Sequence, residues 1–168
     1  EIHKGKGGMF ALAGGAEIGY TLPLGGNGFV TLSGSIMPAE AELTLDEGAS
    51  NKTNNADVKI ELGDIMTVSL SPGFAISESS AIYVKVGYTE ADLVVTGDAT
   101  KLTSMDGTTL AIGTKSLMPS GMFIQTEAGM VDYDSIKLSG LGNYIATTNS
   151  VTADPTVAYG SLTIGYKF

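Results

Sequence analysis

The chain has 168 residues, with 18 acidic and 9 basic side chains and a formal net charge of −9. A chain this acidic is repelled by nucleic-acid phosphates, so we expect no nucleic-acid partner. It contains no Cys, and its one His is His3, which excludes a disulfide framework, a thiolate metal site and most pairs of nucleophile and base. We therefore expect no enzymatic activity, no cofactor and no metal.

Glycine reaches 23 residues, while charged residues make up only 16% of the chain, against about 25% in ordinary soluble domains. No apolar run approaches the ~20 residues of a membrane-spanning helix. A chain of this kind either buries nearly all of its apolar residues or crosses a bilayer as strands. The first residues, EIHKGKGG (1–8), lack the apolar core of a signal peptide, so we expect that an exported protein has already lost its signal.

The dominant hydrophobic period is two, which predicts strands separated by turn residues. The first predicted strand covers about residues 8–22 and is followed by a tight turn, PLGGNG (23–28). The alternation resumes from 29, with apolar residues on one face and Thr or Ser on the other. It slips at Pro38, which predicts a bulge or the end of the spanning part.

A polar connection (46–57) precedes a long strand that runs from about Val58 to Ile76. The short turn SESS (77–80) leads to the next strand, and a second long polar connection is predicted at about 97–107.

A shorter strand then carries Leu110 and Ile112 and ends at the turn MPSG (118–121). The strand after it begins at Met122, and a last long connection is predicted at about 139–155 before the closing strand.

The connections therefore alternate between short and long, so we expect the three short turns at one end of the sheet and the long loops at the other. This arrangement is typical of outer-membrane barrels. Residues 1–168 are thus predicted to form a single domain, an all-β, antiparallel, up-and-down transmembrane β-barrel of about eight strands, of which seven are visible.

Side-chain direction follows from the same alternation. We predict that one set of apolar residues points outward: Leu12, Ile18, Leu32, Val68, Val84, Ile112, Ile124 and Leu162. A second set is predicted to point inward: Glu17, Thr31, Ser69, Lys85, Glu127 and Thr163. The charges predicted to line a narrow lumen are Glu17, Lys59, Glu61, Lys85, Lys115 and Glu127. Asp64 and Glu90 fall on the apolar face, so we expect them near the outer interface.

Seven visible strands pose a problem of parity, since bacterial single-chain barrels have an even number. The first and last visible strands run in the same direction, so direct closure would need a parallel seam. We therefore expect an intervening strand, from residues missing at the N-terminus or from a partner chain. A cryptic strand within 1–8 is the alternative, although its Gly and Lys residues do not favour a strand.

The last residues, YGSLTIGYKF (159–168), alternate and end in Phe, and they resemble an outer-membrane assembly signal. NGFVTLSGSIMPAEAEL (27–43), YVKVGYTEADL (83–93) and GMFIQTEAGMVDYDS (121–135) add to the likeness. The chain resembles small porin-like or opacity-like barrels, most of all the abundant small barrel proteins of marine alphaproteobacteria. The resemblance implies insertion by the outer-membrane assembly machinery, with an assembly signal made of Leu162, Ile164, Tyr166 and Phe168.

Other residues suggest contacts with the surroundings. The aromatic residues expected at a membrane interface are Tyr20, Phe74, Tyr166 and Phe168. Asp132 and Asp134, near one strand end, are candidates for binding calcium. The acidic side chains of the connections are candidates for sharing divalent cations with anionic lipid headgroups: Asp46, Glu47, Asp57, Asp98 and Asp106. Solvated charges are the favoured interpretation in both cases.

Three functions remain open. The first is a structural or surface-exposed barrel in the bacterial outer membrane, in contact with lipid and lipopolysaccharide, whose long extracellular loops meet surface ligands or phage. The second is a narrow porin-like channel for small solutes, although about eight strands leave an interior that side chains fill. The third is a soluble calycin-like ligand-binding barrel, which would carry its apolar residues inside.

Overall fold

The computed structural model describes residues 12–38, 41–45, 58–96, 101–139 and 150–168. Within these ranges the chain is all-β, and no helix there is long and apolar enough to cross a membrane. The strands are β1 (Ala16–Gly25), β2 (Gly28–Met37), β3 (Ala41–Leu45), β4 (Val58–Ala75), β5 (Ser80–Thr96), β6 (Lys101–Leu117), β7 (Met122–Tyr133), β8 (Ile136–Ser139), β9 (Ser150–Ala153) and β10 (Thr156–Tyr166).

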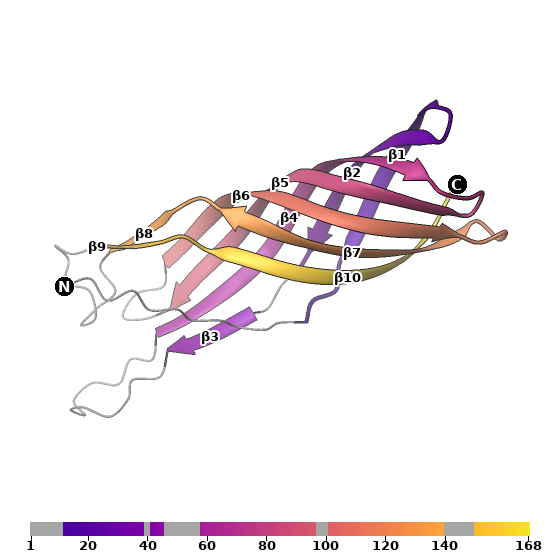
Figure 1. Cartoon of the computed structure of the whole chain (residues 1–168). Coiled ribbons are helices and arrows are strands. Elements are labelled where there is room, and N and C mark those ends of the chain that lie inside the picture. Colours follow the sequence, from indigo (N-terminus) through magenta and orange to yellow (C-terminus); the bar gives the residue numbers. More distant parts are fainter. Residues whose placement is uncertain (1–11, 39–40, 46–57, 97–100, 140–149) are drawn as a thin grey trace.

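Seven of these strands lie side by side in the order β1-β2-β4-β5-β6-β7-β10, and every neighbouring pair is antiparallel (Figure 1). The predicted seven-stranded up-and-down architecture is therefore confirmed. β3 pairs with β4 beyond the break that follows β2, and β8 pairs with β9 in a separate two-stranded sheet. The break falls at Pro38, which has no N–H to donate to a ladder.

The three short turns lie together at one end of the sheet, with the C-terminus (Figure 1). We call this the turn end, formed by 26–27, 76–79 and 118–121, and we call the opposite end the loop end. Gly25, Gly26 and Gly121 have φ of 91°, 57° and 85°, a backbone region that favours glycine. β4 begins at the loop end and reaches the turn end at Ala75, so the connection 46–57 and the turn 76–79 meet it at opposite ends, as predicted.

The bounds of the first strand differ from the prediction of 8–22. β1 begins at Ala16 and continues to Gly25, because Leu22 and Pro23 still pair with β2. Pro23 is tolerated because β1 is an edge strand. The turn is therefore shorter than the predicted 23–28. Residues 1–11 lie outside the described part of the chain.

The predicted connection at 97–107 is wrong over most of its length, because β6 already begins at Lys101. β9 likewise occupies part of the connection predicted at 139–155, and it pairs with β8. In β6 the outward residues near the loop end are polar, as at Ser104 and Asp106. Because these residues are polar, the sequence pattern did not predict that the strand continues beyond the apolar part of the wall.

The sheet is curled but not closed. Glu17 Oε2 on β1 lies 3.0 Å from Lys85 Nζ on β5, three strands away in the sheet order. The inner faces of these two strands therefore face each other. β1 and β10 are the two ends of the sheet, and among the described residues no pairing joins them. These are the two free edges expected from the sequence.

Candidate functional site

The wall of the curled sheet has an apolar outer face over much of its length. Six of the eight residues predicted to point outward are exposed on strands and Ile124 is half-buried, whereas Leu12 precedes β1 and its predicted direction is not tested. Of the residues predicted to point inward, Thr31, Ser69, Lys85 and Glu127 are buried and Thr163 is half-buried. Glu17 lies on the edge strand and points to the interior, where it contacts Lys85. The predicted side-chain directions are therefore confirmed in these strands.

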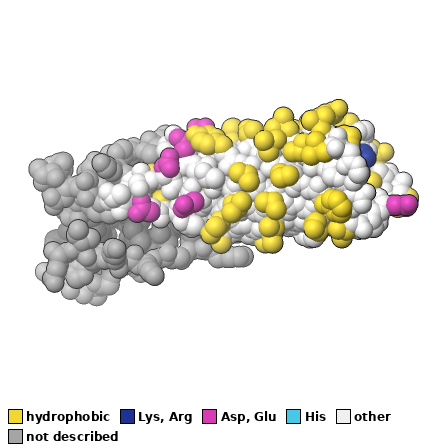
Figure 2. Space-filling view, turned by 45° about the horizontal axis from the view of Figure 1, so that its top comes forward, with side chains coloured by type: hydrophobic (Ala, Val, Ile, Leu, Met, Phe, Trp, Pro, Cys, Tyr) yellow, Lys and Arg dark blue, Asp and Glu magenta, His cyan; other side chains and the backbone are white. Residues whose placement is uncertain are grey.

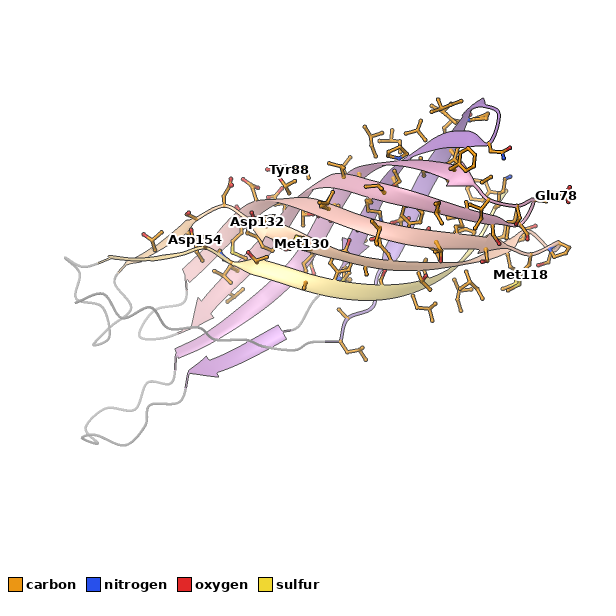
Figure 3. All side chains as sticks on the ribbon, in the orientation of Figure 1. Glu78, Tyr88, Met118, Met130, Asp132 and Asp154 are labelled. Atoms are coloured by element: carbon orange, nitrogen blue, oxygen red, sulfur yellow. The ribbon has the colours of Figure 1, made fainter. Side chains whose placement is uncertain are left out.

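The outer face changes character toward the loop end. From the turn end to about the level of Tyr88 it carries a belt of apolar side chains. Beyond the belt the exposed residues are polar and include seven acidic side chains: Asp64, Glu90, Asp92, Asp106, Asp132, Asp134 and Asp154. Figure 2 shows the hydrophobic side chains along the wall and acidic ones gathered at one border of this belt. In Figure 3, Tyr88, Asp132 and Asp154 lie toward the loop end, and Glu78 and Met118 at the turn end.

The interior, in contrast, is apolar at the loop end and polar toward the turn end. At the loop end it holds an apolar cluster of Ala91, Leu93, Met105, Val131 and Tyr133, against which Ile65, Ile136 and Tyr159 pack. Further toward the turn end the buried residues are mainly polar. Hydroxyl pairs link neighbouring strands there, at 2.8 Å for Thr21 and Thr31, 2.9 Å for Ser33 and Ser69, and 2.9 Å for Thr67 and Thr89. Each buried hydroxyl of these pairs therefore has a partner, which limits the cost of burying it.

A charged cluster lies at the centre of this polar interior. Lys85 Nζ is 2.8 Å from Glu127 Oε2 and 3.0 Å from Glu17 Oε2. Glu127 also accepts hydrogen bonds from Tyr83 Oη at 2.7 Å and from Tyr159 Oη at 2.8 Å. One cation is thus shared by two carboxylates, and the more buried carboxylate receives two further donors. Such pairing is what allows charges to remain in a buried site.

Inward-facing aromatic rings near the turn end cover glycines on the neighbouring strand. Phe29 is paired with Gly73, Tyr83 with Gly113, and Phe123 with Gly165. A Cβ placed on Gly113 would lie 2.3 Å from the Tyr83 ring, and one on Gly165 would lie 2.2 Å from the Phe123 ring. These glycines make room for the rings, which fill the space inside the curled sheet.

The six predicted lumen charges have three outcomes. Glu17, Lys85 and Glu127 come together in the charged cluster. Lys115 is separate and lies with its Nζ 4.6 Å from the centre of the Phe123 ring, a cation–π contact. The side chains of Lys59 and Glu61 lie outside the described residues. Asp64 and Glu90 are exposed beyond the apolar belt, where the sequence placed them.

The residues of the proposed assembly signal lie on or just after β10. Leu162, Ile164 and Tyr166 are exposed on the outer face, and Phe168 follows the strand at the turn end. Phe74 also lies near the turn end, so three of the four predicted interface aromatics share one end of the sheet. Tyr20 does not, because β1 extends to Gly25 and places it in mid-strand.

Two features of the interior were not predicted from the sequence. Tyr83 and Tyr159 lie at inward positions and both donate to Glu127. An apolar cluster lies at the loop end, in which Leu93 and Met105 are buried. The sequence does indicate this cluster: its apolar residues occupy inward positions in the part of the strands where the outward residues become acidic. Among the described residues no group of acidic or His side chains is arranged to hold a metal ion.

The chain matches no protein-family model, and neither curated proteins nor solved structures gave a match. The functional interpretation therefore rests on the geometry of the wall and its interior.

Proposed function

We propose that the chain is an integral protein of the bacterial outer membrane, with a structural or surface-interaction role carried by the loop end. The observation that supports this most is the apolar belt outside a polar interior. A soluble barrel places apolar side chains in its core, whereas a barrel in lipid exposes them to the acyl chains. Leu70, Val86 and Leu110 are register partners on three neighbouring strands, and all three are about half exposed.

The size of the belt agrees with a bilayer. On β4 and in the turn after it, the outward apolar residues run from Met66 to Ile76, and a segment of that length spans roughly 33 Å at about 3.3 Å per residue. With the strand tilt of about 40° usual in such barrels, the belt is ~25 Å tall, comparable with the ~25 Å apolar band of outer-membrane proteins. The acidic residues beyond Tyr88 would then lie in the headgroup region or outside it.

The interior is filled with side chains, which favours a non-conducting barrel over a channel. The Lys85 cluster occupies the polar part, and the apolar cluster around Leu93 and Tyr133 occupies the loop end. A water-filled path would have to displace both. The same polar interior argues against a calycin-like carrier, which needs an apolar cavity for its ligand. The proposed partners are membrane lipid and lipopolysaccharide, the outer-membrane assembly machinery, and surface ligands or phage at the loop end.

The proposal is tested by expressing the chain with an export signal in a Gram-negative host and separating inner from outer membranes. The expected result is a band in the outer-membrane fraction that resists extraction by alkaline carbonate and migrates faster before boiling than after it. Recovery of the protein in the soluble periplasmic fraction, with the same migration before and after heating, would contradict the proposal. Deletion of Phe168 serves as a companion variant, expected to lower the amount inserted.

A further inference from the structure

Among the described residues, the two ends of the sheet carry backbone groups without a strand partner. In an antiparallel pair, alternate residues direct their N–H and C=O groups toward the partner, and the others direct them away. β1 pairs only with β2, and β10 pairs only with β7 among the strands of this sheet. Each edge therefore presents a row of donors and acceptors to the seam between them. Such an edge is a template for another strand.

The direction of the two edge strands determines which direction a strand between them must have to pair with both. β1 and β10 both run from the loop end to the turn end (Figure 1). If they paired directly, the seam would be parallel, whereas all described pairs are antiparallel. One strand running from the turn end to the loop end would pair antiparallel with both edges.

In a membrane, where all copies have the same orientation, a second copy of the chain does not meet this requirement. A copy in the same orientation presents its own β1 and β10, and both of these edges run from the loop end to the turn end. Its edge would therefore meet β1 or β10 in parallel. The occupant is a strand of the opposite direction, which the described edges do not supply.

The walls of the seam define the chemistry of this strand. The outward positions beside it are apolar, as at Ile18, Tyr20 and Leu162. The inward positions are polar, as at Glu17 and Tyr159, which belong to the charged cluster. The occupant therefore alternates apolar residues with small or polar ones. β2 has this direction and this pattern, with sequence GFVTLSGSIM.

The two ends of the chain differ in their access to the seam. A strand that finishes at the loop end leads directly into β1, which begins there at Ala16, so it continues the up-and-down order. After β10, the Lys167 N–H donates to the Gly121 carbonyl at 2.8 Å. This bond holds the backbone against the β6–β7 turn, on the β7 side of β10 and away from the seam.

We propose that the seam between β1 and β10 is a site for one further β-strand, supplied by the polypeptide on the N-terminal side of β1 and antiparallel to both edges. The inference rests on the proposed function in one step, since a membrane is what fixes a second copy in the same orientation. Strand pairing and membrane location are measured separately, so the failure of one is distinguishable from the failure of the other.

The width of the seam is measured with pairs of nitroxide labels on the full chain, which has no Cys of its own. Neighbouring strands are about 5 Å apart and next neighbours about 10 Å apart. Ile18→Cys is combined in turn with a Cys at one of four outward positions of β10: Ala158, Gly160, Leu162 and Ile164. Register partners give two matched controls, Thr126/Leu162 for neighbours and Thr114/Leu162 for next neighbours.

The expected result is dipolar broadening at all four seam pairs that does not exceed that of the Thr114/Leu162 control. Broadening at any seam pair equal to that of the Thr126/Leu162 control would show direct closure and overturn the proposal.

The source and number of strands are tested by adding a copy of GFVTLSGSIM before Glu1 or after Phe168 of the full chain. A scrambled copy before Glu1 is the control. The N-terminal addition is expected to slow amide exchange in both β1 and β10, and to raise the unfolding temperature by about 2–4 °C or more. The C-terminal addition and the scrambled copy are expected to do neither. Unchanged exchange with the N-terminal addition, or equal protection by the C-terminal one, would overturn the proposal.

Discussion

Replacing Lys85 with Met removes the cation that two interior carboxylates share. The Glu127 side chain is only 4% exposed, so its charge would lose a partner at 2.8 Å without gaining water. Tyr83 and Tyr159 would still donate to it, but two neutral donors do not balance a buried charge. Breaking a buried ion pair by removing one partner costs about 3–5 kcal/mol, and we expect a loss of stability in this range.

The two carboxylates predict different sizes of effect. The Glu17 side chain is 24% exposed, so Glu17→Gln is expected to cost no more than about 1 kcal/mol, as for partly solvated pairs. The double variant Lys85→Met/Glu127→Gln removes both charges of the closest pair but keeps an amide oxygen that can still accept from Tyr83 and Tyr159, so no buried charge is left without a partner. We expect it to recover most of the stability lost in Lys85→Met.

The free energy of unfolding is measured by urea titration of the refolded protein in detergent micelles, followed by far-UV circular dichroism. Glu78→Gln is the control, because Glu78 is exposed in a turn and its replacement is expected to have little effect. A loss below about 1 kcal/mol for Lys85→Met, the size typical of surface ion pairs, would refute the reasoning that the cluster is buried and mutually balanced. So would a double variant that is less stable than Lys85→Met alone.

Two further predictions concern the wall. Gly113→Ala places a methyl group against the Tyr83 ring and is expected to destabilise the fold by about 1–3 kcal/mol, whereas Gly34→Ala, whose Cβ meets nothing within 4 Å, is expected to be nearly neutral in the same titration. Leu162→Arg puts a charge into the apolar belt and is expected to lower the free energy of unfolding in lipid vesicles by about 2–4 kcal/mol. Asp92→Arg, beyond the belt, is expected to lower it by about 0–1 kcal/mol. Equal losses would place both residues in the same environment.

The sequence was sufficient to predict which face each residue of the central strands occupies. Alternation in a strand leaves no choice once one residue is assigned, so Ser69 and Lys85 follow from Val68 and Val84. The strand bounds were harder to predict. β6 begins at Lys101 although the sequence of 97–107 is typical of a polar connection. Its outer residues there, Ser104 and Asp106, are polar, and a strand with a solvated outer face resembles a loop.

The contacts inside the curled sheet could not be predicted from local pattern. Glu17 and Lys85 meet across three strands, a contact that depends on the curvature of the whole sheet. The apolar cluster at the loop end was missed for a different reason. Along most of each strand the outward residues are apolar and the inward residues are polar. Where the outer face becomes acidic this distribution is reversed, so that Leu93 is buried beside the exposed Asp92.

The central claim, that the apolar belt faces lipid, is tested most directly by depth-dependent quenching. Single Cys residues at Leu162, Thr163 and Asp92 are labelled with an environment-sensitive fluorophore in protein reconstituted into vesicles whose acyl chains carry spin labels. Strong quenching is expected at Leu162, in the belt, and weak quenching at Asp92, beyond it. Thr163, one residue from Leu162 but on the inner face, should also be quenched weakly. Equal quenching at Leu162 and Thr163, or none at Leu162, would contradict a membrane-spanning barrel.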